Sequence, residues 1–102
     1  MRLKNLKQYK MNKAKYTLDD ERNQVFDGYE EIATIQADIQ PCSGQLKVQL
    51  YGIEITKYLT VYMYPNEEVQ EGLYIEVDGK YYEIQVIEHW DRHIRFDMKV
   101  VD

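Results

Sequence analysis

The residues best suited to chemistry in this sequence are crowded into one short stretch. His89, Trp90, Asp91, Arg92 and His93 are consecutive, and they include the only tryptophan and both histidines of the chain. Two imidazoles and a carboxylate can bind zinc, and a His–Asp pair can orient an imidazole for acid–base catalysis. The stretch lacks the fixed helical spacing that makes such a set informative, and no plausible nucleophile lies near it. We interpret it as a hairpin connection in which Trp90 packs on a neighbouring element or a partner.

Other reactive residues give no stronger signal. Cys42 is the only cysteine, so it cannot form an internal disulfide, and a lone cysteine is usually a small buried residue. The carboxylates fall mostly at outward strand positions or in loops, and the five glycines are scattered as turn markers rather than gathered in a phosphate-binding loop. We therefore predict a protein that is not an enzyme and that binds no cofactor and no metal.

Alternation of apolar and polar residues is the dominant pattern, and this period of two is typical of half-buried strands. Asp78-Gly79 separates two such segments and suits the positive φ angles of a tight hairpin. Residues 8–18 could supply a further strand. We predict a mainly all-β fold, a small antiparallel β-barrel of about six strands in a single domain over residues 1–102. The alternating segments are residues 33–39, 58–64, 73–78, 81–86 and 94–100.

Three segments break the alternation. Residues 1–15 are predicted to form a basic N-terminal arm, and residues 19–28 a mobile acidic loop. Residues 43–52 form either a long excursion from the sheet or a short helix, with Ser43 as its cap and Gly52 at its end. Loops of this length in compact domains are uncommon and usually functional.

Charge is distributed unevenly along the chain. Residues 1–15 carry six basic side chains and no acid, whereas residues 16–102 carry seven basic and 18 acidic side chains, a net charge of −11. An acidic body disfavours a nucleic-acid groove, which needs clustered cations. The basic arm could contact an acidic partner or nucleic acid, or simply be solvated. No apolar run is long enough for a signal-peptide core or a membrane span, so we expect a protein without a membrane role.

Outward-facing tyrosines are the best candidates for a binding surface. Tyr58, Tyr62 and Tyr64 share one face of their predicted strand. Tyrosine gives large contact area at low entropic cost and is enriched in protein interfaces. We predict that these three residues, with Trp90, contact protein. Base stacking in an oligonucleotide-binding barrel is the alternative, which the acidic charge disfavours.

The order of motifs from about Ile32 onward resembles one known family. The residues that carry the likeness are "ADIQPCSGQLKVQLYGIEITKYLTVYMYP" and "EGLYIEVDGKYYEIQVIEHWDRHIRFDMKVV". In order they show a strand ending in Pro-x-Ser-Gly, a linker with Tyr-Gly, a strand running to Pro, and a Gly-Lys-x-Tyr turn before the closing Trp and His. This order resembles the head-completion, or head–tail connector "stopper", proteins of tailed bacteriophages and Gram-positive prophage elements.

The resemblance implies a structural virion protein at the head–tail interface, assembled in the bacterial host cytoplasm. It implies a homo-oligomeric ring in the assembled connector, below the portal or adaptor, that closes the DNA exit channel and docks the tail, while double-stranded DNA passes without sequence-specific binding. Whether the subunit alone is a monomer is left open. A stretch rich in small and polar residues leaves the sheet and is the candidate channel loop: Ser43, Gly44, Gln45 and Lys47. A tail-completion or minor capsid role is the alternative within this group of proteins.

Overall fold

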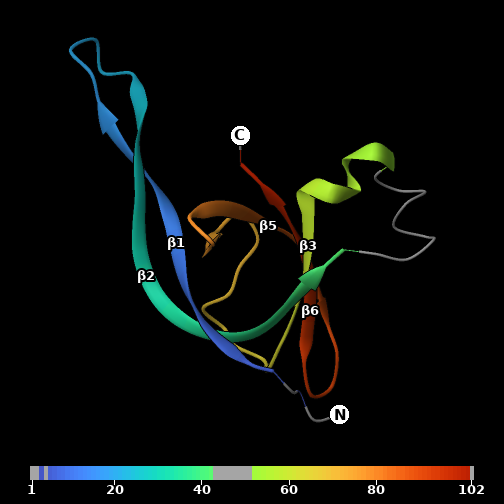
Figure 1. Ribbon diagram of the computed structural model, residues 1–102. Helices are drawn as coiled ribbons and strands as arrows, with labels where there is room; N and C mark the ends of the chain where they lie inside the picture. The colour runs from blue at the N-terminus through green and yellow to red at the C-terminus, as the bar shows by residue number, and fades with distance from the viewer. Residues whose placement is uncertain (1–2, 4, 43–51, 102) are drawn as a thin grey trace.

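The computed structural model describes residues 3, 5–42 and 52–101 and shows an all-β fold (Figure 1). Six antiparallel strands close into a barrel in the order β1-β2-β3-β6-β5-β4. This arrangement confirms the predicted fold class. The elements are β1 (Lys7–Leu18), β2 (Gln24–Pro41), the 3-10 helix η1 (Gly52–Lys57), β3 (Tyr58–Met63), β4 (Tyr74–Val77), β5 (Lys80–His89) and β6 (Ile94–Val100).

The barrel interior is filled mostly by the apolar residues of the alternating segments, as the sequence predicted, with Met11 and Val69 from outside those segments. Phe96 on β6 and Ile84 on β5 are among the fully buried side chains. Burial of such side chains supplies the main driving force for folding. The buried cluster consists of Met11, Ile35, Ala37, Val61, Met63, Val69, Ile75, Ile84, Ile94, Phe96 and Met98.

The hairpin between β4 and β5 confirms the Asp-Gly prediction. Asp78 and Gly79 both have positive φ angles, 51° and 78°, and Val77 pairs directly with Lys80. Two consecutive positive φ angles are characteristic of the tight turn whose twist matches that of the flanking strands. This turn places β4 and β5 beside each other at the open end of a cleft described below.

The longest hairpin corrects two predictions about the N-terminal third. The predicted basic arm contributes residues 7–15 to β1, and residues 24–28 of the predicted acidic loop belong to β2. The connection is a short turn in which the Asp19 carboxylate accepts hydrogen bonds from the backbone amides of Glu21 and Asn23, at 2.9 and 2.8 Å. Such side-chain capping of a turn needs no apolar residue.

Alternation of apolar and polar residues did not indicate the start of β2, because the pairing of β2 with β1 contains register shifts. Ala14 pairs with Tyr29, but Tyr16 pairs with Phe26, so β2 has one extra residue between these pairs. Gly28 lies in this bulge with a φ of 88°, a conformation that glycine adopts readily. The bulge brings Phe26 and Tyr29, three residues apart, to the same face, and this breaks the alternation that the sequence analysis required.

The excursion between β2 and β3 is described only at its ends. The helix predicted from Ser43 to Tyr51 lies outside the described residues. Gly52, predicted as the end of that helix, is instead the first residue of η1. Within the described ranges, no helix has the length and apolar character needed to cross a membrane.

Candidate functional site

The most distinctive feature of the structure is a two-stranded extension of the barrel, which we call the ribbon. It comprises residues 13–18 of β1 and 24–31 of β2, and it projects away from the other strands (Figure 1). Six residues of strand span roughly 20 Å. The ribbon contributes to an elongated molecule with extents of 51 × 30 × 24 Å.

Large apolar side chains are exposed on this ribbon. Tyr16 and Phe26 are 56% and 50% exposed and lie on one face, directly opposite each other in the register. Leu18 and Val25, nearer the tip, are also exposed. Single exposed apolar residues are normal, but a group of them on one projecting element is typical of an interaction site.

The ribbon also has two free edges. β4 pairs with residues 10–12 of β1, and β3 pairs with residues 38–41 of β2. Beyond these points, no strand in the described part of the chain pairs with the outer edge of either ribbon strand. An isolated two-stranded hairpin is marginally stable in water, and open edges invite pairing with another chain. The ribbon therefore has the geometry of an element that a partner completes.

Stacked aromatic rings attach the base of the ribbon to the barrel. Tyr29 lies parallel to Tyr81 with ring centroids 3.9 Å apart, and it meets Tyr74 and Phe26 edge-on at 4.9 and 5.1 Å. Phe26 in turn meets Tyr16 at 6.0 Å. Such offset and edge-to-face pairs contribute about 0.5–1.5 kcal/mol each beyond the area they bury.

The same rings line a cleft of about 710 Å³ between the ribbon and the β4–β5 hairpin. Its floor is formed by apolar and aromatic groups, and one cation, Lys80, lies at its margin. The ribbon and the cleft together form one continuous surface. The lining residues are Tyr16, Phe26, Tyr29, Tyr74, Gly79, Lys80, Tyr81, Val100 and Val101.

Burial in this cleft, reinforced by the nearby Glu83 charge, raises the pKa of Tyr74 from 10.0 to about 12. The Tyr74 hydroxyl donates a hydrogen bond of 3.2 Å to Glu83 Oε2. Burial also raises the pKa of Tyr29, with Tyr81 and Glu83 as further causes. Both phenols therefore stay neutral to a higher pH than an ordinary tyrosine.

Alkaline pH is expected to destabilise the protein partly through Tyr74. Its pKa in the folded state, about 12, exceeds the ordinary 10.0, so its contribution to stability is present below pH 10.0 and is lost as the pH rises toward 12. Tyr74→Phe removes this ionisation and should lose less stability between about pH 9 and about pH 11.5. Urea denaturation of both proteins at the two pH values checks this. Parallel losses in the two proteins would contradict the assignment.

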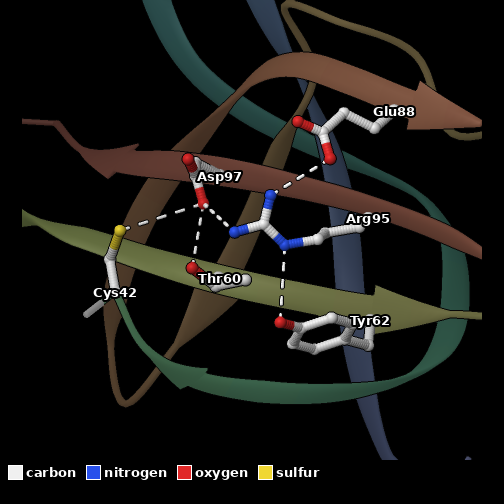
Figure 2. A network of polar contacts seen from close by, with 6 residues as sticks. All are labelled: Cys42, Thr60, Tyr62, Glu88, Arg95 and Asp97. Atoms are coloured by element: carbon white, nitrogen blue, oxygen red, sulfur yellow. Dashed lines mark hydrogen bonds and ion pairs between the residues drawn. The ribbon is translucent and has the colours of Figure 1, made fainter. Parts of the chain in front are cut away.

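A polar network between β3 and β6 centres on Asp97, whose side chain is 6% exposed (Figure 2). Asp97 Oδ1 accepts hydrogen bonds from Thr60 Oγ1 at 2.9 Å and from Cys42 Sγ at 3.9 Å. Arg95 Nη2 lies 4.0 Å from the same oxygen. A buried carboxylate is tolerated because these donors replace water.

Arg95 extends this network to the surface. It donates to Glu88 Oε2 at 3.1 Å and to the Tyr62 hydroxyl at 3.4 Å (Figure 2). The hydrogen bonds to Tyr62 and Glu88 raise the pKa of Arg95, against a lowering by burial. The Cys42 amide also donates to the Tyr58 carbonyl at 3.4 Å. The network thus joins the two ends of the excursion, at Cys42 and at the start of β3.

The predicted interface tyrosines lie in the neighbourhood of this network. Tyr62 packs its ring near Arg95, and Tyr58 packs near the Lys99 ammonium, with cation-to-centroid distances of 5.8 and 5.7 Å. Tyr64 is 42% exposed and accepts a hydrogen bond from the Leu3 amide. Strand β6 lies between β3, which carries Tyr58 and Tyr62, and β5, which carries Tyr81. The interface role of the three tyrosines stays a prediction.

The cluster of histidines and tryptophan is the turn between β5 and β6, as predicted, with His89 as the last residue of β5. The Trp90 amide donates to the His93 carbonyl at 2.9 Å, and the Trp90 ring stacks on that of His93. Trp90 is 57% exposed. Among residues 3, 5–42 and 52–101, no three His, Cys, Asp or Glu side chains gather as a metal-binding group.

The remaining predicted site residues are Ser43, Gly44, Gln45 and Lys47, and all four lie outside the described residues.

Sequence reasoning missed the ribbon and the cleft residues Tyr16, Phe26 and Tyr29. A signal was present, because Phe26 lies within the charged segment that we interpreted as a loop, and Tyr16 and Tyr29 lie close to its two ends. It also missed Asp97, since alternation alone places this residue on the solvent face.

The fold and the surface define a small closed antiparallel β-barrel that carries a projecting ribbon and an aromatic cleft. No protein-family model and no curated protein sequence matches the chain. Its structure is similar to the solution structure of protein SF1141 from Shigella flexneri 2a, with a TM-score of 0.69, 13% identity, and coverage of 98% of this chain and 96% of that one. This likeness establishes a shared fold.

Proposed function

We propose that this protein is a structural subunit of a phage head–tail connector. Copies of it form a ring below the portal or adaptor, close the DNA exit channel, and dock the tail. The proposal starts from the resemblance of residues 32–101 to head-completion proteins. In this role the protein acts through assembly and catalyses no reaction.

The observation that most favours the proposal is the ribbon. Its exposed apolar residues, such as Tyr16 and Phe26, and its open strand edges are features that a partner would cover. A subunit that works only inside an assembly can carry such an element. A free-standing enzyme or transport protein would have to protect it.

Charge and the placement of the excursion also support a conduit role. The body of the chain, residues 16–102, has a net charge of −11, and an acidic wall repels DNA and lets it slide past. The predicted channel residues lie in the sequence between the end of β2 at Pro41 and the start of η1 at Gly52, outside the described residues. Both ends are held by the Asp97 network, so the barrel provides a rigid base for a segment that obstructs the channel.

The oligonucleotide-binding alternative is less favoured by the geometry of the aromatic residues. Base stacking needs exposed ring faces next to cations. In the cleft, the face of Tyr29 is covered by Tyr81 at 3.9 Å. On β3, Tyr58 and Tyr62 already pack against the side chains of Lys99 and Arg95.

Deletion of the gene in the native strain, followed by prophage induction and electron microscopy, tests the proposal. We expect heads without tails, emptied of DNA, beside free and complete tails, because the channel is not closed and the tail has no docking surface. Expression of the wild-type gene from a plasmid should restore complete virions.

Normal virions after the deletion would contradict the connector role. Heads that are full of DNA, together with tails whose ends have an abnormal structure, would instead favour the tail-completion alternative. Salt-dependent binding of single-stranded DNA by the isolated protein, together with normal virions, would favour the oligonucleotide-binding alternative.

A further inference from the structure

The two strands of the longest hairpin carry opposite charge. β1 contains four basic residues and no acidic one, and β2 contains four acidic residues and no basic one. The basic residues are Lys7, Lys10, Lys13 and Lys15; the acidic ones are Asp27, Glu30, Glu31 and Asp38. The ribbon therefore has one basic edge, formed by β1, and one acidic edge, formed by β2.

These charges remain accessible. Lys13 and Glu30 form a cross-strand ion pair at 3.5 Å, but their side chains are 53% and 54% exposed. Exposed pairs of this kind contribute little by themselves, and both groups can contact a further charge. Lys15 and Glu31 are exposed as well.

We propose that the acidic β2 edge of one ribbon pairs with the basic β1 edge of the ribbon in a second copy of this chain. The strands of a hairpin are antiparallel, so β2 of one copy and β1 of the next also run antiparallel when the ribbons stand side by side. The pairing continues the sheet from copy to copy and supplies backbone hydrogen bonds to both open edges.

Charge complementarity is what identifies the occupant as a second copy. Pairing of two β2 edges around a twofold axis would set Glu30 and Glu31 against the same residues of the partner, and pairing of two β1 edges would set Lys13 and Lys15 against lysines. Like charges directly opposite on neighbouring strands are destabilising. The β2-to-β1 arrangement instead places Glu30 of one copy beside the lysines of the next, on the face where Lys13 and Glu30 pair within the hairpin.

The arrangement also has a consequence for assembly. A contact between two different edges is heterologous, so each copy keeps one free edge after pairing. Such contacts build closed rings when the rotation between copies closes, and filaments when it does not. The aromatic faces of successive ribbons, at Tyr16 and Phe26, then lie on one side of the continuous sheet.

This inference deepens the proposed function by naming the contact between ring subunits, and it rests on the proposed function only for the closure of the ring. Two charge-reversed variants of the full chain test it. The acidic variant, Lys13→Glu with Lys15→Glu, has two acidic edges. The basic variant, Glu30→Lys with Glu31→Lys, has two basic edges. A third protein combines all four substitutions and restores one edge of each sign.

Sedimentation velocity at low ionic strength measures association, because exposed charges are least screened there. We expect wild-type protein to form species larger than a monomer. The acidic variant and the basic variant, each with two edges of the same charge, should each associate roughly tenfold or more weakly than wild-type protein. An equimolar mixture of the acidic and basic variants should recover the large species, and so should the fourfold variant. Thermal melts followed by circular dichroism check that each protein is folded.

A wild-type protein that stays monomeric at millimolar concentration would overturn the inference, and a strand of another protein would then be the edge partner. The inference would also be overturned if the acidic or the basic variant alone associated as strongly as wild type. The same holds if the mixture of the two, or the fourfold variant, failed to form the large species. These outcomes are independent of the deletion phenotype. Tail-less heads after the deletion, together with no self-association of the protein, would support the connector role and exclude this contact. Normal virions together with charge-dependent self-association would exclude the connector role and support this contact.

Discussion

Asp97→Ala is expected to lower the free energy of unfolding by about 2–4 kcal/mol. Asp97 is buried and accepts from Thr60 and Cys42, and it is the buried counter-ion of Arg95. Its removal leaves these donors without their acceptor at a site with little access to water. Arg95 keeps its contact with Glu88, which limits the loss. Urea denaturation measures the change, and a thermal midpoint lower by roughly 10 °C or more should accompany it.

Glu88→Gln is the matched control for this prediction. Glu88 belongs to the same network but its side chain is 47% exposed, so we expect a change below about 1 kcal/mol. An equal loss of stability in the two variants would show that burial of Asp97 does not set the energy of the network. A loss at Asp97 alone would identify this carboxylate as the group that stabilises the base of the excursion.

Tyr29→Ala is expected to loosen the ribbon while leaving the barrel folded. Tyr29 makes three aromatic contacts, with Phe26, Tyr74 and Tyr81. Loss of these contacts should weaken the attachment of the ribbon by about 1.5–3 kcal/mol. Backbone amides of residues 24–31 should then exchange with solvent roughly tenfold faster or more. Hydrogen exchange measured by mass spectrometry checks this.

Leu18→Ala provides the comparison. Leu18 is on the same ribbon, near its tip, and is 66% exposed, so its truncation removes little buried area and should leave exchange in residues 24–31 nearly unchanged. Amides of β3 and β6 should remain protected in both variants, because their interior residues Val61 and Phe96 are untouched. Uniformly faster exchange over the whole chain in Tyr29→Ala would mean that the ring cluster stabilises the barrel itself.

The sequence predicted the fold most reliably in the strands whose side chains alternate between the barrel interior and its surface. In β3 and β6, residues such as Val61 and Phe96 face the interior, and their period of two follows directly from strand geometry. The Asp78-Gly79 turn was also predictable, because the backbone angles it needs are chemically restricted. These features depend on neighbours in the sequence.

The ribbon was missed because it does not obey that rule. Outside the barrel no interior buries one face of β1, so Lys13 and Lys15 occupy one face and the exposed Tyr16 the other. The bulge at Gly28 then shifts the register of β2. In β2 this shift interrupts the period of two, and the many charged residues around it resemble those of a solvated arm and loop.

The sequence by itself determined the fold class, the Asp-Gly hairpin and the turn that carries Trp90, because local backbone chemistry and alternation specify them. Only the tertiary structure decided that Tyr29 meets Tyr74 and Tyr81, and that Asp97 is buried beside Thr60. These contacts join strands that are distant in the chain, and their partners follow from strand order and register around the barrel. Register depends on the sum of many weak pairings across the closed sheet, which no single segment of the sequence contains.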